Sequence, residues 1–194
     1  MSSLLYLHGF LSSPASVKAT QTRDYLQQHA PGVAVICPEL ENSPARLKPQ
    51  LLELMAGHAE LSGGDLRVIG SSMGGYLATW LVEQYGGKAV LVNPAVRPFE
   101  LLAGYLGEHI NPYTNKHFAL NQDDIGHIQA FYQPTLARPA NYRVLLQSGD
   151  ETLDYQQAVA HYQGAELCIE EGGDHSFVGY EQHLPSIMRF LYLQ

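Results

Sequence analysis

Ser72 lies within Gly70-Ser71-Ser72-Met73-Gly74, which matches the pattern G-x-S-x-G. A serine hydroxyl attacks a carbonyl carbon when a nearby base takes its proton, so the motif points to nucleophilic catalysis. The apolar run 66–69 precedes the motif, and a segment typical of a helix follows it. Between a strand and a helix, this pattern forms a tight turn that lifts the serine oxygen above the end of a sheet. The sequence therefore predicts Ser72 as the nucleophile.

His175 is the best candidate for the base that would activate Ser72. It lies in Gly172-Gly173-Asp174-His175-Ser176-Phe177, directly after the last predicted strand, and the glycines allow this loop to turn the imidazole back over the sheet. His161 and His183 also lie late in the chain. Both fall in predicted helices among surface residues, and we expect them to be solvated. We therefore predict His175 as the base.

The acid that orients the base should follow the predicted strand 143–147, because the three groups run in the order serine, acid, histidine when the serine occupies such a turn. Asp150 comes directly after this strand and is the favoured acid. Asp154 is one turn later and precedes a helical segment, so its alternative role is a helix N-cap. Glu151 is expected to face solvent. Asp174 is adjacent to the base in sequence, which disfavours an orienting hydrogen bond.

Two backbone N–H groups are candidates to bind the negative charge that develops on the carbonyl oxygen. The N–H of Met73 lies at the N-terminus of a predicted helix. The second group is expected from the loop 7–13, where Gly9 permits close approach of the backbone and the N–H of Phe10 is our candidate. His8 is interpreted as a structural residue that packs inside or hydrogen-bonds to this loop.

Short apolar runs alternate with longer amphipathic ones, which is typical of strands joined by helices. We predict six strands, at residues 4–7, 33–37, 66–69, 89–92, 143–147 and 166–169. We predict helices at residues 15–29, 43–61, 73–85, 155–162 and 180–191. Several strand runs are continuously apolar, as expected when helices cover both faces of a mostly parallel sheet. With the motif, this pattern predicts an α/β-hydrolase fold in one domain spanning residues 1–194.

The segment 95–140 breaks the alternation and is rich in Tyr, Phe, His, Asn and Pro. Its length and its position between two core strands indicate a lid over the site. The alternative is a helical excursion that only packs on the sheet. Its aromatic residues could line an acyl pocket or serve as packing residues: Phe99, Tyr105, Tyr113, Phe118, Phe131 and Tyr132.

Composition excludes several classes of function. A net charge of −8 argues against nucleic acid or an anionic membrane as the main partner. The sequence has no apolar run long enough for membrane insertion and no signal-peptide pattern, so we expect a cytoplasmic protein. Cys37 and Cys168 are isolated and are interpreted as core thiols in a reducing compartment. The histidines lack H-E-x-x-H or H-x-H spacing, so we expect neither a metal ion nor another cofactor.

Six segments carry a resemblance to a known family. They are Leu7-His8-Gly9-Phe10, Ser12-Ser13-Pro14, residues 70–76, Asn93-Pro94-Ala95, residues 149–155 and residues 171–177. Together they resemble the YqiA-type bacterial esterases, which are small cytoplasmic α/β-hydrolases. The resemblance covers nearly the whole chain. It implies hydrolysis of carboxylic esters, with activity on acyl-CoA thioesters and short acyl chains in some members. Carried over residue by residue, it implies Ser72 as nucleophile, Asp150 as acid and His175 as base.

These observations predict a serine esterase or thioesterase that cleaves small acyl substrates through an acyl-enzyme. One alternative is an acyltransferase that uses the same three residues and an acceptor other than water. Another is a non-catalytic module that binds small ligands. In each case the expected partner is a small molecule, and for the enzyme it is an acyl ester or thioester.

Overall fold

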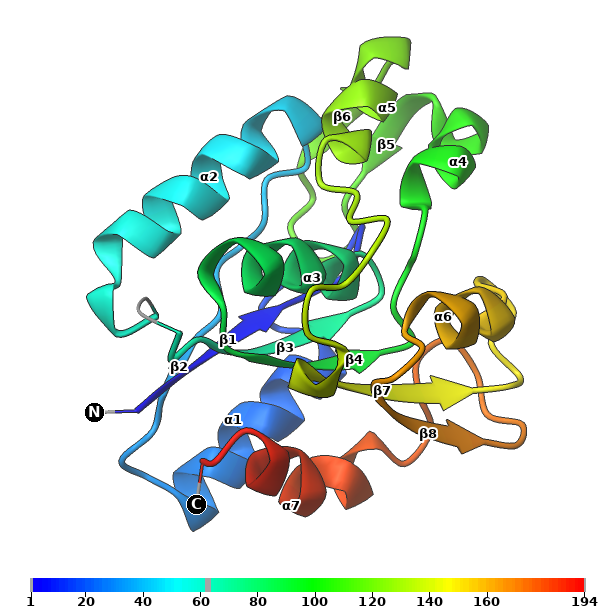
Figure 1. Cartoon of the computed structure of the whole chain (residues 1–194). Helices are drawn as coiled ribbons and strands as arrows, with labels where there is room; N and C mark the ends of the chain where they lie inside the picture. Colours follow the sequence, from blue (N-terminus) through cyan, green and yellow to red (C-terminus); the bar gives the residue numbers. More distant parts are fainter. Residues whose placement is uncertain (1, 62–63, 194) are drawn as a thin grey trace.

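A six-stranded parallel sheet organises the computed structural model, which describes residues 2–61 and 64–193 (Figure 1). The strand order is β2-β1-β3-β4-β7-β8, and every neighbouring pair is parallel. The strands are β1 (Ser3–Leu7), β2 (Ala34–Ile36), β3 (Arg67–Ser71), β4 (Lys88–Val92), β7 (Tyr142–Gln147) and β8 (Glu166–Glu170). The six predicted strands are therefore confirmed, with bounds that move by one or two residues.

Helices cover both faces of this sheet, as the continuous apolar strands predict. On one face lie α1 (Val17–His29) and α7 (Tyr180–Phe190), and on the other lie α2 (Pro44–Gly57), α3 (Met73–Tyr85) and α6 (Tyr155–His161) (Figure 1). Alternate residues of β1 pack against the helix layers on the two faces of the sheet. Leu4 and Tyr6 pack with α1 and α7, whereas Leu5 and Leu7 pack with α2 and α3. Among the described residues, no helix has the length and apolar character needed to cross a membrane.

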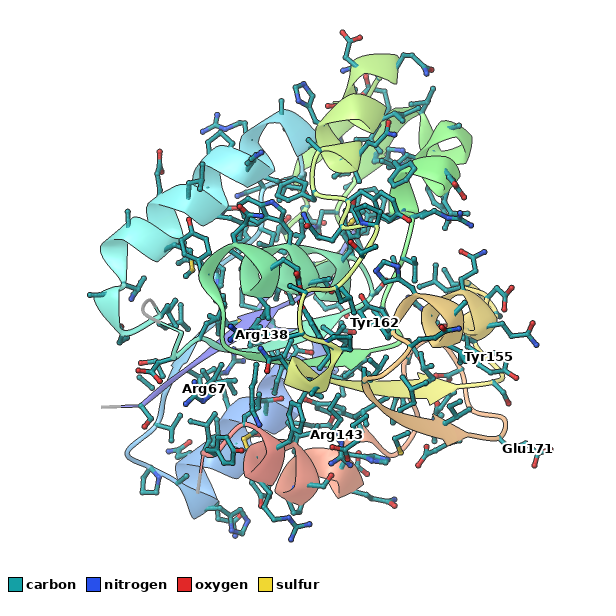
Figure 2. All side chains as sticks on the ribbon, viewed as in Figure 1. Arg67, Arg138, Arg143, Tyr155, Tyr162 and Glu171 are labelled. Atoms are coloured by element: carbon teal, nitrogen blue, oxygen red, sulfur yellow. The ribbon has the colours of Figure 1, made fainter. Side chains whose placement is uncertain are left out.

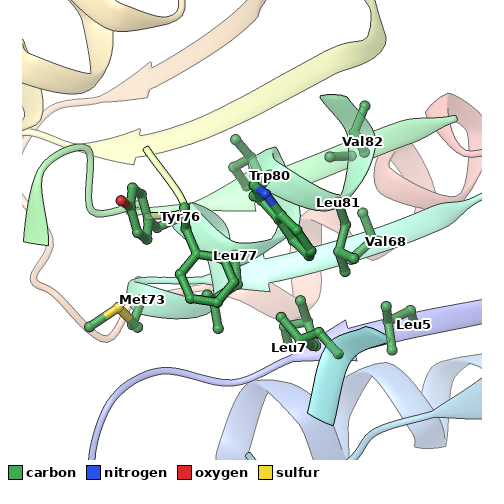
Figure 3. Packing of buried hydrophobic residues seen from close by; sticks show 14 of the residues in the cluster. Leu5, Leu7, Val68, Met73, Tyr76, Leu77, Trp80, Leu81 and Val82 are labelled. Atoms are coloured by element: carbon green, nitrogen blue, oxygen red, sulfur yellow. The ribbon is translucent and has the colours of Figure 1, made fainter. Parts of the chain in front are cut away.

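Helix α3 is the buried centre of the second layer. Every residue from Met73 to Val82 is buried. Figure 3 shows Leu77, Trp80 and Leu81 of this helix beside Leu5 and Leu7 of β1. Complete burial of a leucine side chain contributes roughly 1.5–3 kcal/mol. The large apolar contact fixes the N-terminus of α3, and hence the turn that contains Ser72, above β1 and β3.

The chain order of the strands creates a crevice at one edge of the sheet. From β1 the chain passes to the outer strand β2, and it then returns to β3 on the other side of β1. Connections therefore diverge between β1 and β3, and ligands of such sheets bind at this point, beyond the carboxyl ends of the strands. The loop with Phe10 follows β1, and Ser72 follows β3.

The segment 95–140 contains more regular structure than its sequence indicates. It holds α4 (Pro98–Leu102), the antiparallel pair β5 (Gly107–Ile110) and β6 (His117–Leu120), and α5 (Gln122–Gln129), with short 3₁₀ helices at Ala103–Tyr105 and Pro139–Asn141. Helix α5 packs against α2 and α4. The β5–β6 hairpin is absent from the sequence prediction, because its strands are short and half polar and lack the apolar alternation of a strand.

Two predicted helices differ by more than one residue at an end. The expected helix 43–61 ends at Gly57, and a separate 3₁₀ turn covers Ala59–Leu61. The expected helix 15–29 begins at Val17. Neither change moves a predicted site residue.

Buried tyrosines connect helix α6 to α3 through packing and a hydrogen bond. Tyr162, which Figure 2 labels between α6 and α3, shares a hydrogen bond of 2.8 Å with the Thr79 hydroxyl. Tyr142 at the start of β7 packs against Tyr162 at 6.0 Å between ring centroids. These contacts fix the ends of the loop that joins β7 to α6 and carries Asp150.

Candidate active site

Ser72 occupies a backbone conformation that L-residues rarely adopt. Its φ is 55° and its ψ is −120°. Hydrogen bonds hold the residue there: its N–H donates to Val92 O at 3.0 Å, and its carbonyl accepts from Gly75 N at 2.9 Å and Ala95 N at 3.1 Å. Such strain persists where surrounding contacts enforce it, and it is concentrated at functional sites. The turn is the strand-to-helix elbow that the motif predicts.

The glycines of the motif are required by close backbone contacts. A Cβ atom on Gly70 would overlap the carbonyl of Gly74, and one on Gly74 would overlap the carbonyl of Leu7. Because backbone atoms cannot move aside as a flexible side chain does, a methyl group at either position would displace α3 from the sheet.

Gly74→Ala should therefore destabilise the protein by about 3 kcal/mol, the upper end of the range for overpacking. Urea unfolding followed by circular dichroism measures this change. Gly126→Ala is the matched control, because Gly126 also lies in a helix but has no atom within 4 Å of the added Cβ. The control should be neutral or stabilising by up to about 1 kcal/mol. Equal midpoints for Gly74→Ala and the wild type would contradict the packing argument.

Ser72, His175 and Asp150 form a continuous chain of hydrogen bonds. The Ser72 Oγ lies 3.0 Å from Nε2 of His175, and Nδ1 of His175 lies 2.8 Å from Oδ2 of Asp150. A carboxylate only accepts hydrogen bonds, so Nδ1 carries the ring proton and Nε2 is free to accept the proton of Ser72. The structure therefore brings together the three residues chosen from the sequence.

Asp150 is an ionised carboxylate held in a buried position. Its side chain is 2 % exposed. Burial by itself raises the pKa of Asp150, but the hydrogen bonds from His175, Leu153 and Thr152 and the charge of His175 outweigh that effect, so the pKa lies below its ordinary value. Oδ1 accepts from Thr152 N at 2.9 Å and from Leu153 N at 2.8 Å. These bonds aim Oδ2 at the imidazole.

The neighbouring acids have other contacts. Asp154 is the N-cap of α6 and accepts from Gln156 N at 2.9 Å, so its alternative role from the sequence is confirmed. Glu151 is exposed, as expected, yet its carboxylate also accepts from the backbone N–H of His175 at 3.0 Å. Two consecutive acids thus contact the ring and the backbone of the same histidine.

Two buried polar residues that the sequence did not indicate as site residues hold the His175 loop. Asn93, at the end of β4, donates from Nδ2 to the carbonyls of Asp174 at 3.0 Å and His175 at 3.3 Å. Gln147, at the end of β7, accepts from Asp174 N at 3.2 Å and from Val178 N at 2.9 Å. Both are polar residues at the carboxyl end of an apolar strand, and that pattern could have revealed them.

The loop after β1 passes directly beside Ser72. A Cβ atom on Gly9 would lie 3.8 Å from Ser72 Oγ. His8 is 3 % exposed; its Nε2 accepts from Leu40 N at 3.1 Å and its Nδ1 contacts Gly9 O at 2.9 Å, while burial lowers its pKa. Within the described residues, neither the N–H of Phe10 nor that of Met73 donates to a protein acceptor. Both N–H groups thus remain available to a substrate.

The hydrogen-bonded residues Ser72 and His175 lie beside a cleft of about 460 Å³. Ser72 and His175 line it, together with the start of α1 and the exposed Tyr113. A second, smaller cavity of about 30 Å³ lies between the Phe10 loop, α2 and α3, where Met73 and Leu77 line it. Most of the other aromatic residues of the segment 95–140 are packing residues: Phe131 is fully buried, Phe99 packs on Tyr132, and Tyr105 and Phe118 pack on Phe10.

The expectation that His161 and His183 are solvated is wrong. His183 is 16 % exposed and lies 2.9 Å from Glu170 Oε1. His161 is half-buried and stacks on Tyr132, and its burial lowers its pKa. Helical periodicity places these residues toward the surface, but the β8 edge and the segment 95–140 cover them. In the part of the chain that the structure describes, no three His, Cys, Asp or Glu side chains gather as metal ligands.

Solved structures similar to this chain share its fold at low sequence identity. Est1E from Butyrivibrio proteoclasticus, solved with ferulic acid bound, matches with a TM-score of 0.73 and 14% identity over 99% of this chain and 88% of its own. Alpha/beta hydrolase domain-containing protein 10 from mouse matches with a TM-score of 0.71 and 14% identity, over 98% and 89%. The esterase domain of a Rhodothermus marinus protein matches with a TM-score of 0.65 and 14% identity, over 98% and 85%. These likenesses confirm the α/β-hydrolase fold.

A family model matches almost the entire chain, from residue 3 to residue 192. Its description is Uncharacterised protein family (UPF0227). The matched range contains all six segments that carry the resemblance found in the sequence. The chain therefore belongs to this family, the YqiA-type family of the α/β-hydrolase fold.

Proposed function

We propose that this protein is a serine hydrolase that cleaves carboxylic esters or acyl thioesters of small acyl substrates. The observation that carries the proposal is the chain of hydrogen bonds from Asp150 through His175 to Ser72 at the wall of an open cleft. Nucleophile, base and orienting acid are the three groups that acyl transfer through serine requires. The α/β-hydrolase fold of the family supports the same reading.

In the first half of the reaction, Ser72 Oγ forms a bond to the acyl carbon while its proton passes to Nε2 of His175. The carbonyl oxygen becomes negatively charged, and the N–H groups of Phe10 and Met73 bind it. The tetrahedral intermediate then expels the alcohol or thiol, and Nε2 returns its proton to the leaving oxygen or sulfur. Asp150 keeps the imidazole in the required tautomer and stabilises its charged form.

In the second half, a water molecule takes the place of the leaving group. His175 Nε2 accepts a proton from this water as its oxygen bonds to the acyl carbon. The bond between Ser72 Oγ and the acyl carbon breaks, and Nε2 protonates Oγ. The products are the carboxylic acid and the regenerated enzyme, and no cofactor takes part in either half.

The shape of the site supports a short acyl group. The cavity of about 30 Å³ beside Met73 and Phe10 is the candidate acyl pocket, and its small volume favours a short acyl chain over a long one. Three exposed apolar side chains line the larger cleft: Val17 is 68% exposed, Val178 61% and Tyr113 51%. Tyr113 belongs to the segment 95–140, and we infer that this segment forms a lid at the rim.

We further propose that residues 1–194 form one catalytic domain that acts in the cytoplasm on small-molecule substrates. Both cysteines are free and half-buried, which suits a reducing compartment. The net charge of −8 disfavours nucleic acid and anionic membranes as partners.

Covalent labelling with an alkyl fluorophosphonate tests the proposed function. The expected result is displacement of fluoride and one added phosphonyl group on Ser72, located by mass spectrometry of the peptide, together with turnover of p-nitrophenyl butyrate. Substitution of His175 by alanine should abolish the labelling, because it removes the base. Turnover without labelling of Ser72 would overturn the mechanism. Binding of a small acyl ligand with neither labelling nor turnover would favour the binding module, and an acylated alcohol formed when alcohol is added would favour the acyltransferase.

A further inference from the structure

Lys18 brings a positive charge into the cleft that contains Ser72 and His175. It lies in the first turn of α1, is half-buried, and is the only lysine or arginine among the residues that line this cleft. Its Nζ donates to the carbonyl of Ser176 at 2.8 Å, and Ser176 follows His175 in the chain. The ammonium group is therefore held against the loop that presents the base.

The charge of Lys18 is not neutralised by an ion pair. Among the described residues, no carboxylate oxygen lies within 4.0 Å of Nζ. Glu181 is the only acidic residue in the cleft lining, and it accepts a hydrogen bond from Gln21 at 3.1 Å. Burial lowers the pKa of Lys18, while the charges of Asp174 and Asp150 act in the opposite sense. A half-buried cation that has two remaining N–H donors is suited to bind an anion.

The chemistry of the site determines which part of a substrate meets Lys18. Nε2 of His175 must come within hydrogen-bond distance of the leaving oxygen or sulfur to protonate it. The alcohol or thiol part therefore leaves the acyl carbon on the side of the His175 loop. The carbonyl oxygen points the other way, toward the N–H groups of Phe10 and Met73. Lys18 contacts the His175 loop and is thus on the leaving-group side of the cleft.

We propose that Lys18 binds a negatively charged group on the alcohol or thiol part of the substrate. The preferred substrates are then esters of small acyl groups whose leaving group combines an anion with an apolar body that Val17 and Val178 can contact. This inference rests on the proposed function and specifies the substrate class of the same site.

Three butyryl or succinyl esters with a nitrophenol leaving group test the proposal. p-Nitrophenyl butyrate is neutral, 3-carboxy-4-nitrophenyl butyrate carries its charge on the leaving group, and p-nitrophenyl hemisuccinate carries it on the acyl part. Lys18→Met should lower kcat/KM for the anionic leaving group by about 10- to 100-fold, the value of a hydrogen bond to a charged group. It should leave p-nitrophenyl butyrate within about threefold. Lys18→Arg should restore most of the loss.

Lys48→Met is the matched control, because Lys48 is exposed and lies over Trp80, outside the cleft. Lys48→Met should change kcat/KM by a similarly small factor for all three esters. Added salt should weaken the preference of the wild type for the anionic leaving group. Inhibition constants for benzoate and for phenyl phosphate show whether the site binds a carboxylate or a phosphate more tightly.

Several results would overturn the proposal. An equal loss on all three esters would mean that Lys18 only holds the Ser176 carbonyl in place. A selective loss on the hemisuccinate would assign the anion to the acyl part. No loss on any ester would remove Lys18 from substrate binding. If the wild type cleaves none of the esters, the proposed function fails instead, and calorimetric binding of 5-hydroxy-2-nitrobenzoate to the wild type and to Lys18→Met still decides whether the anion site exists.

Discussion

Ser72→Ala should lower kcat for p-nitrophenyl butyrate by roughly 10⁴ to 10⁶. The reason is that the substitution removes the atom that would bond to the acyl carbon. Alanine can still adopt the φ of 55° at position 72, and the hydrogen bond between His175 and Asp150 is retained. His175→Ala should cause a loss of similar size. The double variant should be no worse than either single one, because nucleophile and base act as one unit. Initial rates of nitrophenol release measure all three.

Ser176→Ala is the control for this series. Ser176 is exposed, lines the same cleft and follows His175, and its backbone carbonyl still accepts from Lys18 after the substitution. Its kcat should remain within about twofold of the wild type, as for a surface substitution. Equal rates for Ser72→Ala and the wild type would show that Ser72 is not the nucleophile, and the binding-module alternative would then be favoured.

Asp150→Asn should lower kcat by about 10⁴ while the protein stays folded. Asparagine has nearly the same shape, but its amide can donate to Nδ1 of His175 and so favour the tautomer with a proton on Nε2, which cannot accept from Ser72. The charge that stabilises the imidazolium is lost as well. Because the pKa of Asp150 lies below its ordinary value, the wild-type carboxylate is ionised throughout the neutral range, and the loss should persist across that range.

Asp154→Asn separates the two candidate acids. Asp154 caps α6 through its contact with Gln156 N, and asparagine caps a helix about as well as aspartate. This variant should keep its activity within about twofold and its stability within about 0.5 kcal/mol. A large loss in Asp154→Asn with little change in Asp150→Asn would reverse the assignment of the acid.

Local patterns in the sequence determined the sheet and the residues at its edge. The apolar runs predict all six strands, because burial on both faces leaves a signal in consecutive residues. The G-x-S-x-G motif identifies the elbow, since its glycines reflect contacts with backbone atoms only a few residues or one strand away. Asp150 and His175 could be chosen because each follows a predicted strand, and parallel strands end at one edge.

Contacts between distant segments were decided only in the tertiary structure. The β5–β6 hairpin has no strong sequence pattern, and it is held by the packing of Phe118 and His109 on Phe10. The roles of Asn93 and Gln147 depend on backbone atoms of the His175 loop, which are at least 27 residues away.

The partners of charged side chains and the burial of helix residues were likewise decided only in the tertiary structure. The sequence shows Glu151 and His183 as polar surface residues, whereas the fold gives each a partner, His175 N and Glu170. Lys18 lies on a helix with no motif, and only the return of the His175 loop against α1 brings it into the cleft. A residue's own neighbours in sequence determine its secondary structure and its type of chemistry. Which distant residues contact a given side chain depends on the order of the strands in the sheet, and no local sequence pattern encodes that order.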